Sequence, residues 1–349
     1  MKNSMLFKRL AVFAFAVAFA LSLTFAVSPS IASAASASID MPKISGITDS
    51  TKTSYKDSLF FVGEYEYAEQ NYTLNYRYYM PEDMSEKVPL VIFLHGRGER
   101  GFDNDSQLNN AILRPFIENE NSKFYKAMVI APQCPVKEYN NGWVELFSDD
   151  ESANSLAYAN YSVDAISESV ECKAIIALIK KTCSQYNVDS DRVYLIGLSQ
   201  GAVATWDLLA RHSDVFAAAV PISGVGDTSK ASIYADIPIY AFHGDADTTV
   251  PYATATPKMY EAVNALGKNN MQFVTYHNGP HAIWEAAIVF KGNGELPALE
   301  DWLFSQTRAS KSAQPEEKGC SGTVPASALA IGMFAMTICA VFVKRRAIG

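Results

Sequence analysis

The sequence predicts an α/β fold, in which a mainly parallel central sheet carries helices on both faces. Short, wholly apolar runs of strand length recur along the chain, and segments with helical periodicity separate them. Strands buried on both faces are typical of parallel sheets, because crossover helices cover both sides. With 349 residues and 49% hydrophobic content, the chain has enough apolar surface for one sizeable core. We expect this domain to span residues 58–306.

The first half of the domain supplies three predicted strands and a helix. Residues 74–80 alternate between apolar and polar, which predicts an edge strand. Residues 88–94 and 128–131 are continuous apolar runs, which predict buried strands. A helix is expected over residues 170–186, where apolar residues recur at helical spacing.

The second half continues the alternation. Strands are predicted at 193–196, 217–222, 237–243 and 271–276, and helices at 202–210 and 257–266. In such a sheet the functional loops follow the carboxyl ends of the strands. We therefore expect the chemistry where these apolar runs stop.

The strand at 193–196 leads directly into the pattern G-x-S-x-G, and a helix follows. Gly197 and Gly201 allow a sharp turn, which would project the hydroxyl of Ser199 from the edge of the sheet. This setting predicts that Ser199 is a nucleophile. The alternative is a serine that only caps the helix.

A nucleophilic serine needs a base, and the five histidines are His95, His212, His243, His277 and His281. The chain order serine, acid, histidine favours His281, with His277 in the same loop as its rival. The acid is expected in the loop 243–251, where Asp245 and Asp247 are both candidates. The composition of that loop does not separate them.

Acyl transfer also needs backbone donors for the developing oxyanion. We expect one to be the N–H of Gln200 and the other the N–H of Arg97, in the glycine-rich loop 94–101. A phosphate-binding loop is the competing interpretation of that turn. It fails because the G-x-x-x-x-G-K-[ST] spacing is missing.

At this point the sequence resembles the α/β-hydrolase superfamily, and within it the secreted esterases related to polyhydroxybutyrate depolymerases and feruloyl esterases. The matching segments are LHGRGERG at 94–101, APQCP at 131–135, GLSQG at 197–201, HGDADTTVP at 243–251 and GPHAIW at 279–284. The resemblance implies an α/β-hydrolase fold and a serine esterase that uses a Ser-His-Asp triad and an acyl-enzyme intermediate.

The resemblance also implies roles for single residues. It favours Asp247 as the acid, because the acid ends the pattern H-G-x-x-D. It implies that His95, Gly96, Trp143 and Trp284 contribute to substrate binding. One departure is Ala282, where an Asp or another polar residue is common.

The substrate is not fixed by these motifs. Residues 137–169 form a long, acidic and aromatic segment, which predicts either a lid over the acyl pocket or plain packing. We expect an ester substrate, derived from an extracellular polymer or plant-wall fragment. A serine peptidase with the same triad and a non-catalytic cell-surface binding protein are the alternatives.

The N-terminal residues 1–34 have the pattern of a secretory signal peptide. Lys2, Lys8 and Arg9 precede an apolar run, and two A-x-A cleavage sites follow, at 32–34 and 35–37. An uncleaved anchor helix is the alternative. Residues 35–57 would then be an N-terminal extension of the domain.

The C-terminal residues carry a second targeting pattern. A polar linker with Gly319-Cys320 is expected at 307–323, a transmembrane helix at 324–343 and a basic cytoplasmic end at 344–349. The Gly-Cys pair, apolar helix and terminal basic cluster resemble bacterial C-terminal sorting tails, which a membrane protease cleaves. A buried core helix and a lipid-anchor signal are the alternatives.

Charge and cysteines exclude other classes of protein. The net charge is −8, although both ends are basic, so the body is strongly acidic and a nucleic-acid partner is excluded. For Cys134 the alternatives are a disulfide with Cys172 or Cys183 and a buried free thiol. No C-x-x-C pair supports a zinc site, and we expect neither a metal nor a cofactor.

Overall fold

The computed structural model describes residues 36–40, 56–110, 112–137, 142–144 and 161–308. The chain divides into two units, Met1–Arg308 and Ala309–Gly349, of which the second lies wholly outside the described residues. The predicted signal peptide and transmembrane helix also lie outside them. None of the helices in the described ranges has the length and apolar character that a membrane crossing requires.

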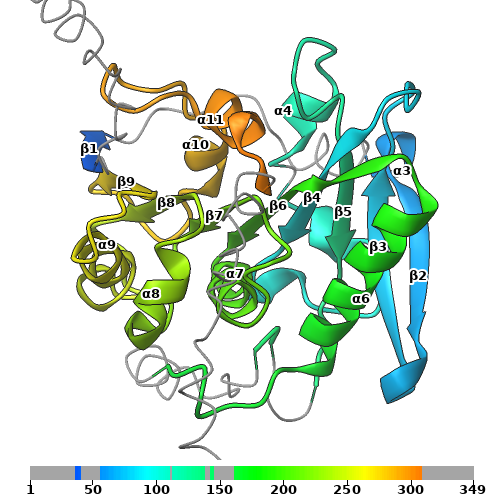
Figure 1. The fold of residues 1–349 in the computed structure, drawn as a ribbon, viewed down its shortest axis with the longest axis horizontal. Coiled ribbons are helices and arrows are strands. Elements are labelled where there is room, and N and C mark those ends of the chain that lie inside the picture. The colour runs from blue at the N-terminus through cyan, green and yellow to red at the C-terminus, as the bar shows by residue number, and fades with distance from the viewer. Residues whose placement is uncertain (1–35, 41–55, 111, 138–141, 145–160, 309–349) are drawn as a thin grey trace, which may run out of the picture. The chain divides into compact units, whose positions relative to one another are not determined.

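A nine-stranded sheet forms the centre of the described part (Figure 1). Its strands lie in the order β1-β9-β8-β7-β6-β4-β5-β3-β2. They are β1 Ser36–Asp40, β2 Phe61–Tyr67, β3 Tyr72–Tyr79, β4 Val88–Leu94, β5 Met128–Pro132, β6 Val188–Leu198, β7 Ala218–Ile222, β8 Ile239–Gly244 and β9 Met271–His277. Neighbouring strands pair in parallel from β1 through β9, β8, β7, β6 and β4 to β5. Strand β3 pairs antiparallel with both β5 and β2. The predicted mainly parallel α/β sheet is confirmed.

Helices cover both faces of this sheet. Figure 1 shows α6, α7, α8 and α9 on one side and α4, α10 and α11 on the other. The helices are α3 Lys56–Leu59, α4 Arg114–Ile117, α6 Val170–Gln185, α7 Gln200–Arg211, α8 Ala231–Tyr234, α9 Thr256–Asn264, α10 Trp284–Ile288 and α11 Leu299–Ser305. Short 3-10 turns, η1 to η5, join several of these elements.

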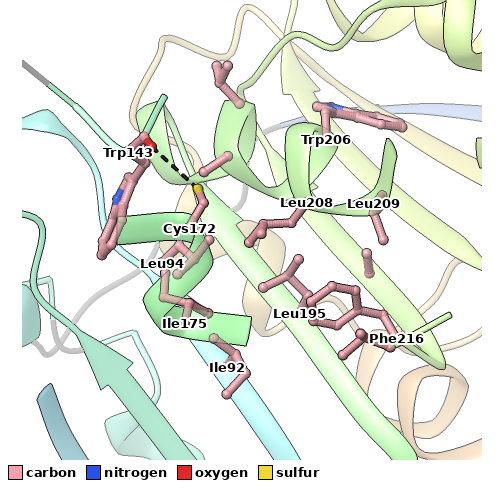
Figure 2. Close-up of a cluster of buried hydrophobic side chains, with 14 of the residues drawn as sticks. Ile92, Leu94, Trp143, Cys172, Ile175, Leu195, Trp206, Leu208, Leu209 and Phe216 are labelled. Carbon is pink, nitrogen blue, oxygen red and sulfur yellow. Dashed lines mark hydrogen bonds between the residues drawn. The ribbon is translucent and has the colours of Figure 1, made fainter. Parts of the chain in front are cut away.

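Strand β4 shows how the apolar runs create two cores. Leu90 and Ile92 face the cluster under α6 to α9, and Val91 and Phe93 face the cluster under α4, α10 and α11. Figure 2 shows part of the first cluster, where Ile92 of β4 lies near Ile175 of α6. Full burial of such a side chain stabilises the fold by about 1.5–3 kcal/mol, which explains why β4 is a continuous apolar run.

The edges of the sheet differ from the prediction. Strand β3 is not an edge strand, because β2 lies outside it. Strand β1 belongs to the expected N-terminal extension, yet it pairs with β9 in parallel. Both missed strands are largely exposed, so they lack the apolar run that marks a central strand. Strand β6 also starts earlier than predicted, at Val188, with polar residues that extend beyond the core.

The three described cysteines are free thiols, so the possible bridge from Cys134 is not formed. Burial raises the pKa of both Cys134 and Cys172. The thiol of Cys172 donates to the carbonyl oxygen of Trp143 at 3.3 Å (Figure 2). Both residues therefore act as small packing groups of the core.

Candidate active site

Ser199 occupies the turn between β6 and α7. Its backbone has φ 53° and ψ −119°, a conformation that costs a non-glycine residue about 1–3 kcal/mol. The turn is held on both sides: the N–H of Ser199 donates to the carbonyl of Ile222 at 2.9 Å, and its own carbonyl accepts from Ala202 at 2.9 Å. The side chain therefore stands at the carboxyl end of the sheet, as predicted.

The flanking glycines have a different role from the one expected. A Cβ on Gly197 would lie 2.2 Å from the carbonyl oxygen of Gly201, and one on Gly201 would lie 2.1 Å from that of Leu94. The left-handed backbone belongs to Ser199 itself. The glycines are needed because β4, β6 and α7 approach too closely for any side chain.

His281 links Ser199 to Asp247. Its Nε2 lies 2.8 Å from Oγ of Ser199, and its Nδ1 lies 2.7 Å from Oδ2 of Asp247. Because the carboxylate only accepts, Nδ1 carries the proton and Nε2 accepts from the serine hydroxyl. This arrangement is able to remove the hydroxyl proton during an attack on a carbonyl carbon.

The carboxyl of Asp247 is fully buried, and burial by itself raises its pKa. Hydrogen bonds from His243, His281 and the backbone N–H of Val250 outweigh this effect and hold the pKa well below its usual range. Thr249 and Val250 donate their N–H groups to Oδ1 at 2.8 and 2.9 Å. Asp247 is therefore a fixed negative charge at neutral pH.

The rival residues lie together at another place. Nδ1 of His277 is 2.6 Å from Oδ2 of Asp245, and the N–H of Asn278 donates to Oδ1 of Asp245 at 2.7 Å. The side chain of His277 is 62% exposed. The structure thus brings His281 and Asp247 to Ser199, and pairs the two alternatives with each other.

Sequence reasoning missed Ser223, which fixes the loop that carries His281. Ser223 follows β7 with φ 53°, and its hydroxyl donates to the carbonyl oxygen of His281 at 2.9 Å. No motif marks Ser223; the only signal is its place at the end of a central strand. On the other side, the ring of Trp284 meets His281 edge-to-face with centroids 5.6 Å apart.

The glycine-rich loop after β4 approaches Ser199. A Cβ on Gly96 would lie 3.5 Å from Cβ of Ser199, and Arg97 begins the turn η2, Arg97–Glu99. Gln200 is the first residue of α7. The two backbone segments predicted to bind an oxyanion therefore both adjoin Ser199.

The side chains of His95 and Trp143, for which the resemblance implies a part in substrate binding, are fully buried. Nε2 of His95 accepts from the N–H of Cys134 at 2.9 Å, so Nδ1 donates to the carbonyl of Gly96 at 2.6 Å. Trp143 Nε1 donates to the carbonyl of His95 at 3.0 Å. These residues brace the loop from behind. Substrate contact by Gly96 and Trp284 stays a prediction.

Glu99 is a second residue that sequence reasoning passed over. A Cβ on Gly96, which would lie 3.5 Å from Cβ of Ser199, would also lie 3.2 Å from Oε2 of Glu99. Asn110 donates to Oε1 at 2.9 Å, and burial raises the pKa of the carboxyl. The carboxyl group of Glu99 therefore lies beside the backbone segment that adjoins Ser199.

The predicted lid segment is described only in part, since residues 138–141 and 145–160 lie outside the described ranges. Of its aromatic residues, Tyr161 is buried and donates its hydroxyl to Oδ1 of Asp207 at 2.6 Å. Arg211 donates to Oδ2 of the same carboxylate at 2.9 Å. For Tyr161, as for Trp143, packing is the correct interpretation.

Comparison with known protein families decides the class. The phospholipase/carboxylesterase family matches residues 80–290, a stretch that runs from before β4 to α10 and contains every residue of the site. The chain belongs to the phospholipase/carboxylesterase family. Its members and relatives are esterases, so the protein is a carboxylic ester hydrolase by family.

Individual proteins similar to this chain are also named as esterases or thioesterases. Acyl-protein thioesterase 1 of Candida albicans is 26% identical over 225 residues, which are 60% of this chain and 91% of the relative. Feruloyl esterase B of Neurospora crassa is 25% identical over 147 residues, 42% of each protein. The crystal structure of a thermostable esterase is 30% identical with a TM-score of 0.60, and the match covers 72% of this chain and 64% of that one.

Proposed function

We propose that the protein hydrolyses carboxylic esters through an acyl-enzyme formed on Ser199. The observation that carries this proposal is the hydrogen-bonded series from Ser199 through His281 to the buried carboxylate of Asp247. It lies in a fold whose family hydrolyses carboxylic esters. The phospholipase/carboxylesterase relatives support the chemistry, and the geometry supports the choice of residues.

In this mechanism Nε2 of His281 takes the hydroxyl proton while Oγ of Ser199 attacks the carbonyl carbon of the ester. The backbone N–H groups of Arg97 and Gln200 donate to the oxyanion of the tetrahedral intermediate. The intermediate expels the alcohol, which receives the proton from His281. Water then attacks the acyl group with His281 as the base again, and Ser199 is released.

Asp247 has two tasks in this cycle. It holds the tautomer of His281 in which Nε2 is free to accept, and it stabilises the imidazolium that forms. The four hydrogen bonds to its carboxylate keep it charged and in place. Oxygen esters with an acyl group attached to an extracellular polymer are the proposed substrates, and the feruloyl esterase relative supports this class.

The test is a panel of p-nitrophenyl, feruloyl, acetyl-xylan and peptide substrates, assayed with the protein and with its Ser199→Ala variant. We expect hydrolysis of at least one ester, and its loss in the variant by about 10⁶-fold in kcat. Faster cleavage of the peptide than of any ester would favour a serine peptidase. Equal turnover by the variant would refute the mechanism.

We also propose that the enzyme is exported and attached to the cell surface. The supporting pattern is the N-terminal signal-like segment and the apolar stretch 324–343 followed by Lys344, Arg345 and Arg346. Ser36 pairs with Phe273, so cleavage at 32–34 leaves β1 whole, whereas cleavage at 35–37 would shorten it. The intact mass of surface-extracted protein tests both ends, since it shows whether residues 321–349 are retained or removed near Cys320. Full-length protein in the cytoplasm would contradict the proposal.

A further inference from the structure

His243 is a fully buried histidine at the end of β8, outside the series from Ser199 to Asp247. Its Nε2 lies 3.0 Å from the carbonyl oxygen of Val250 and 3.1 Å from Oδ2 of Asp247. Carbonyl and carboxylate oxygens only accept hydrogen bonds, so Nε2 carries a proton and is the donor to both. Nδ1 lies 2.8 Å from Oγ1 of Thr256, which fixes the ring from its other side.

Two imidazoles therefore meet at one oxygen of the acid. Oδ2 of Asp247 is 2.7 Å from Nδ1 of His281 and 3.1 Å from Nε2 of His243. Oδ1 already accepts from two backbone N–H groups. The carboxylate cannot rotate without losing all of these partners, so it stays where the two histidines share it.

We propose that His243 is a positioning residue, which shares Oδ2 of Asp247 with His281 and so weakens the hold of the carboxylate on the His281 proton. This inference rests on the proposed function. A donor at Oδ2 draws negative charge from the oxygen, and the imidazolium of His281 is stabilised less. His281 then returns its proton to the departing alcohol more readily.

The surroundings of His243 leave few other groups to account for such an effect. Its titratable neighbours in the described residues include Asp247, His281 on the same carboxylate oxygen, and Tyr252, whose ring lies edge-on with centroids 5.7 Å apart. Thr256 of α9 and the carbonyl of Val250 are neutral. The hydrogen bond from His243 is also one of the causes that keep the pKa of Asp247 low.

The test compares His243→Phe with His243→Gln in the full chain. The Phe variant removes the donor, and the Gln variant offers an amide N–H in the direction of Nε2. The readout is the acidic limb of kcat/KM against pH for a p-nitrophenyl ester, which follows protonation of His281. We expect this limb to move to higher pH by about half a unit to one unit in the Phe variant, and to return in the Gln variant.

An unchanged limb in the Phe variant would overturn the inference, because it would leave His243 with a structural role alone. A shift to lower pH would also overturn it, since it would mean that Asp247 had moved away from His281. If the Phe variant does not fold, His243→Asn, which is too short to reach Oδ2, replaces it against the Gln variant with the same expected shift. An unmodified enzyme without esterase activity would instead refute the proposed function.

Discussion

The two aspartates of the loop after β8, Asp245 and Asp247, are separated by a single residue but have different partners. Asp247 is buried against His281 and His243, whereas Asp245 bonds the exposed His277. The loop sequence does not distinguish them, because both positions offer a carboxylate near the end of a central strand. Only the way the loop folds back, with the N–H groups of Thr249 and Val250 on Oδ1 of Asp247, selects one.

The first prediction follows from this difference. Asp247→Asn should lower kcat by roughly 10⁴, as the loss of the acid of a serine protease triad does, because His281 loses its tautomer and the charge that stabilises it. Asp245→Asn should change kcat only a few-fold. Steady-state kinetics on a p-nitrophenyl ester measures both, and circular dichroism checks the fold. Equal losses would leave the acid unassigned, and a larger loss at Asp245 would reverse the assignment.

Several residues around the site carry no signal that a sequence reader could use. Ser199 and His281 lie in recognisable patterns, and the preference for Asp247 came from family resemblance. Ser223 acts through a contact between segments far apart in the chain. The resemblance implies a part in substrate binding for His95 and Trp143, whereas burial places their side chains behind the loop.

Among the elements of the fold, β4, β6 and α7 lie so close together that no space remains for a side chain at Gly201. A Cβ there would lie 2.1 Å from a backbone carbonyl oxygen, which cannot move without shifting β4. Continuous apolar runs predicted the central strands correctly, since a wholly apolar strand is stable only where both of its faces are buried. It could not predict β1 and β2, which pair by backbone hydrogen bonds at exposed edges.

The second prediction uses two glycines of the site. Gly201→Ala should destabilise the protein by about 3 kcal/mol, because the added methyl group would overlap backbone atoms, which cannot move aside as a flexible side chain can. Gly98→Ala is the matched control, since nothing lies within 4 Å of a Cβ at that position. Urea denaturation of the two variants and the parent gives the difference in unfolding free energy. Similar values for both variants would show that the close approach of α7 is not as described.

At the scale of the whole molecule, acid should unfold the protein through its buried ionisable groups. Burial lowers the pKa of His95 to about 4, against about 6.5 for a histidine in an unfolded chain. As the pH falls from 6.5 to 4, the unfolded state binds a proton that the native state does not, so stability is complete above this window and decreases within it. Asp247, whose pKa is held below its usual range, loses its contribution to the free energy of unfolding only at lower pH.

The third prediction is a loss of about 3 kcal/mol of unfolding free energy from His95 across this window. Urea denaturation between pH 7 and pH 4.5 should show most of it. His95→Gln should be less stable at neutral pH, because the contacts to Cys134 and Gly96 change, yet its stability should depend less on pH. The same dependence in parent and variant would mean that His95 is not the group responsible.

Covalent labelling of the full protein with a fluorophosphonate, followed by peptide mapping, tests directly whether Ser199 is the nucleophile. We expect one modified residue, Ser199, and a labelling rate that falls by orders of magnitude in His281→Ala, because the hydroxyl then lacks its base. Ser223 and the other described serines should stay unmodified. Labelling at a different serine, or equal labelling with and without His281, would contradict the claim that Ser199 is the nucleophile.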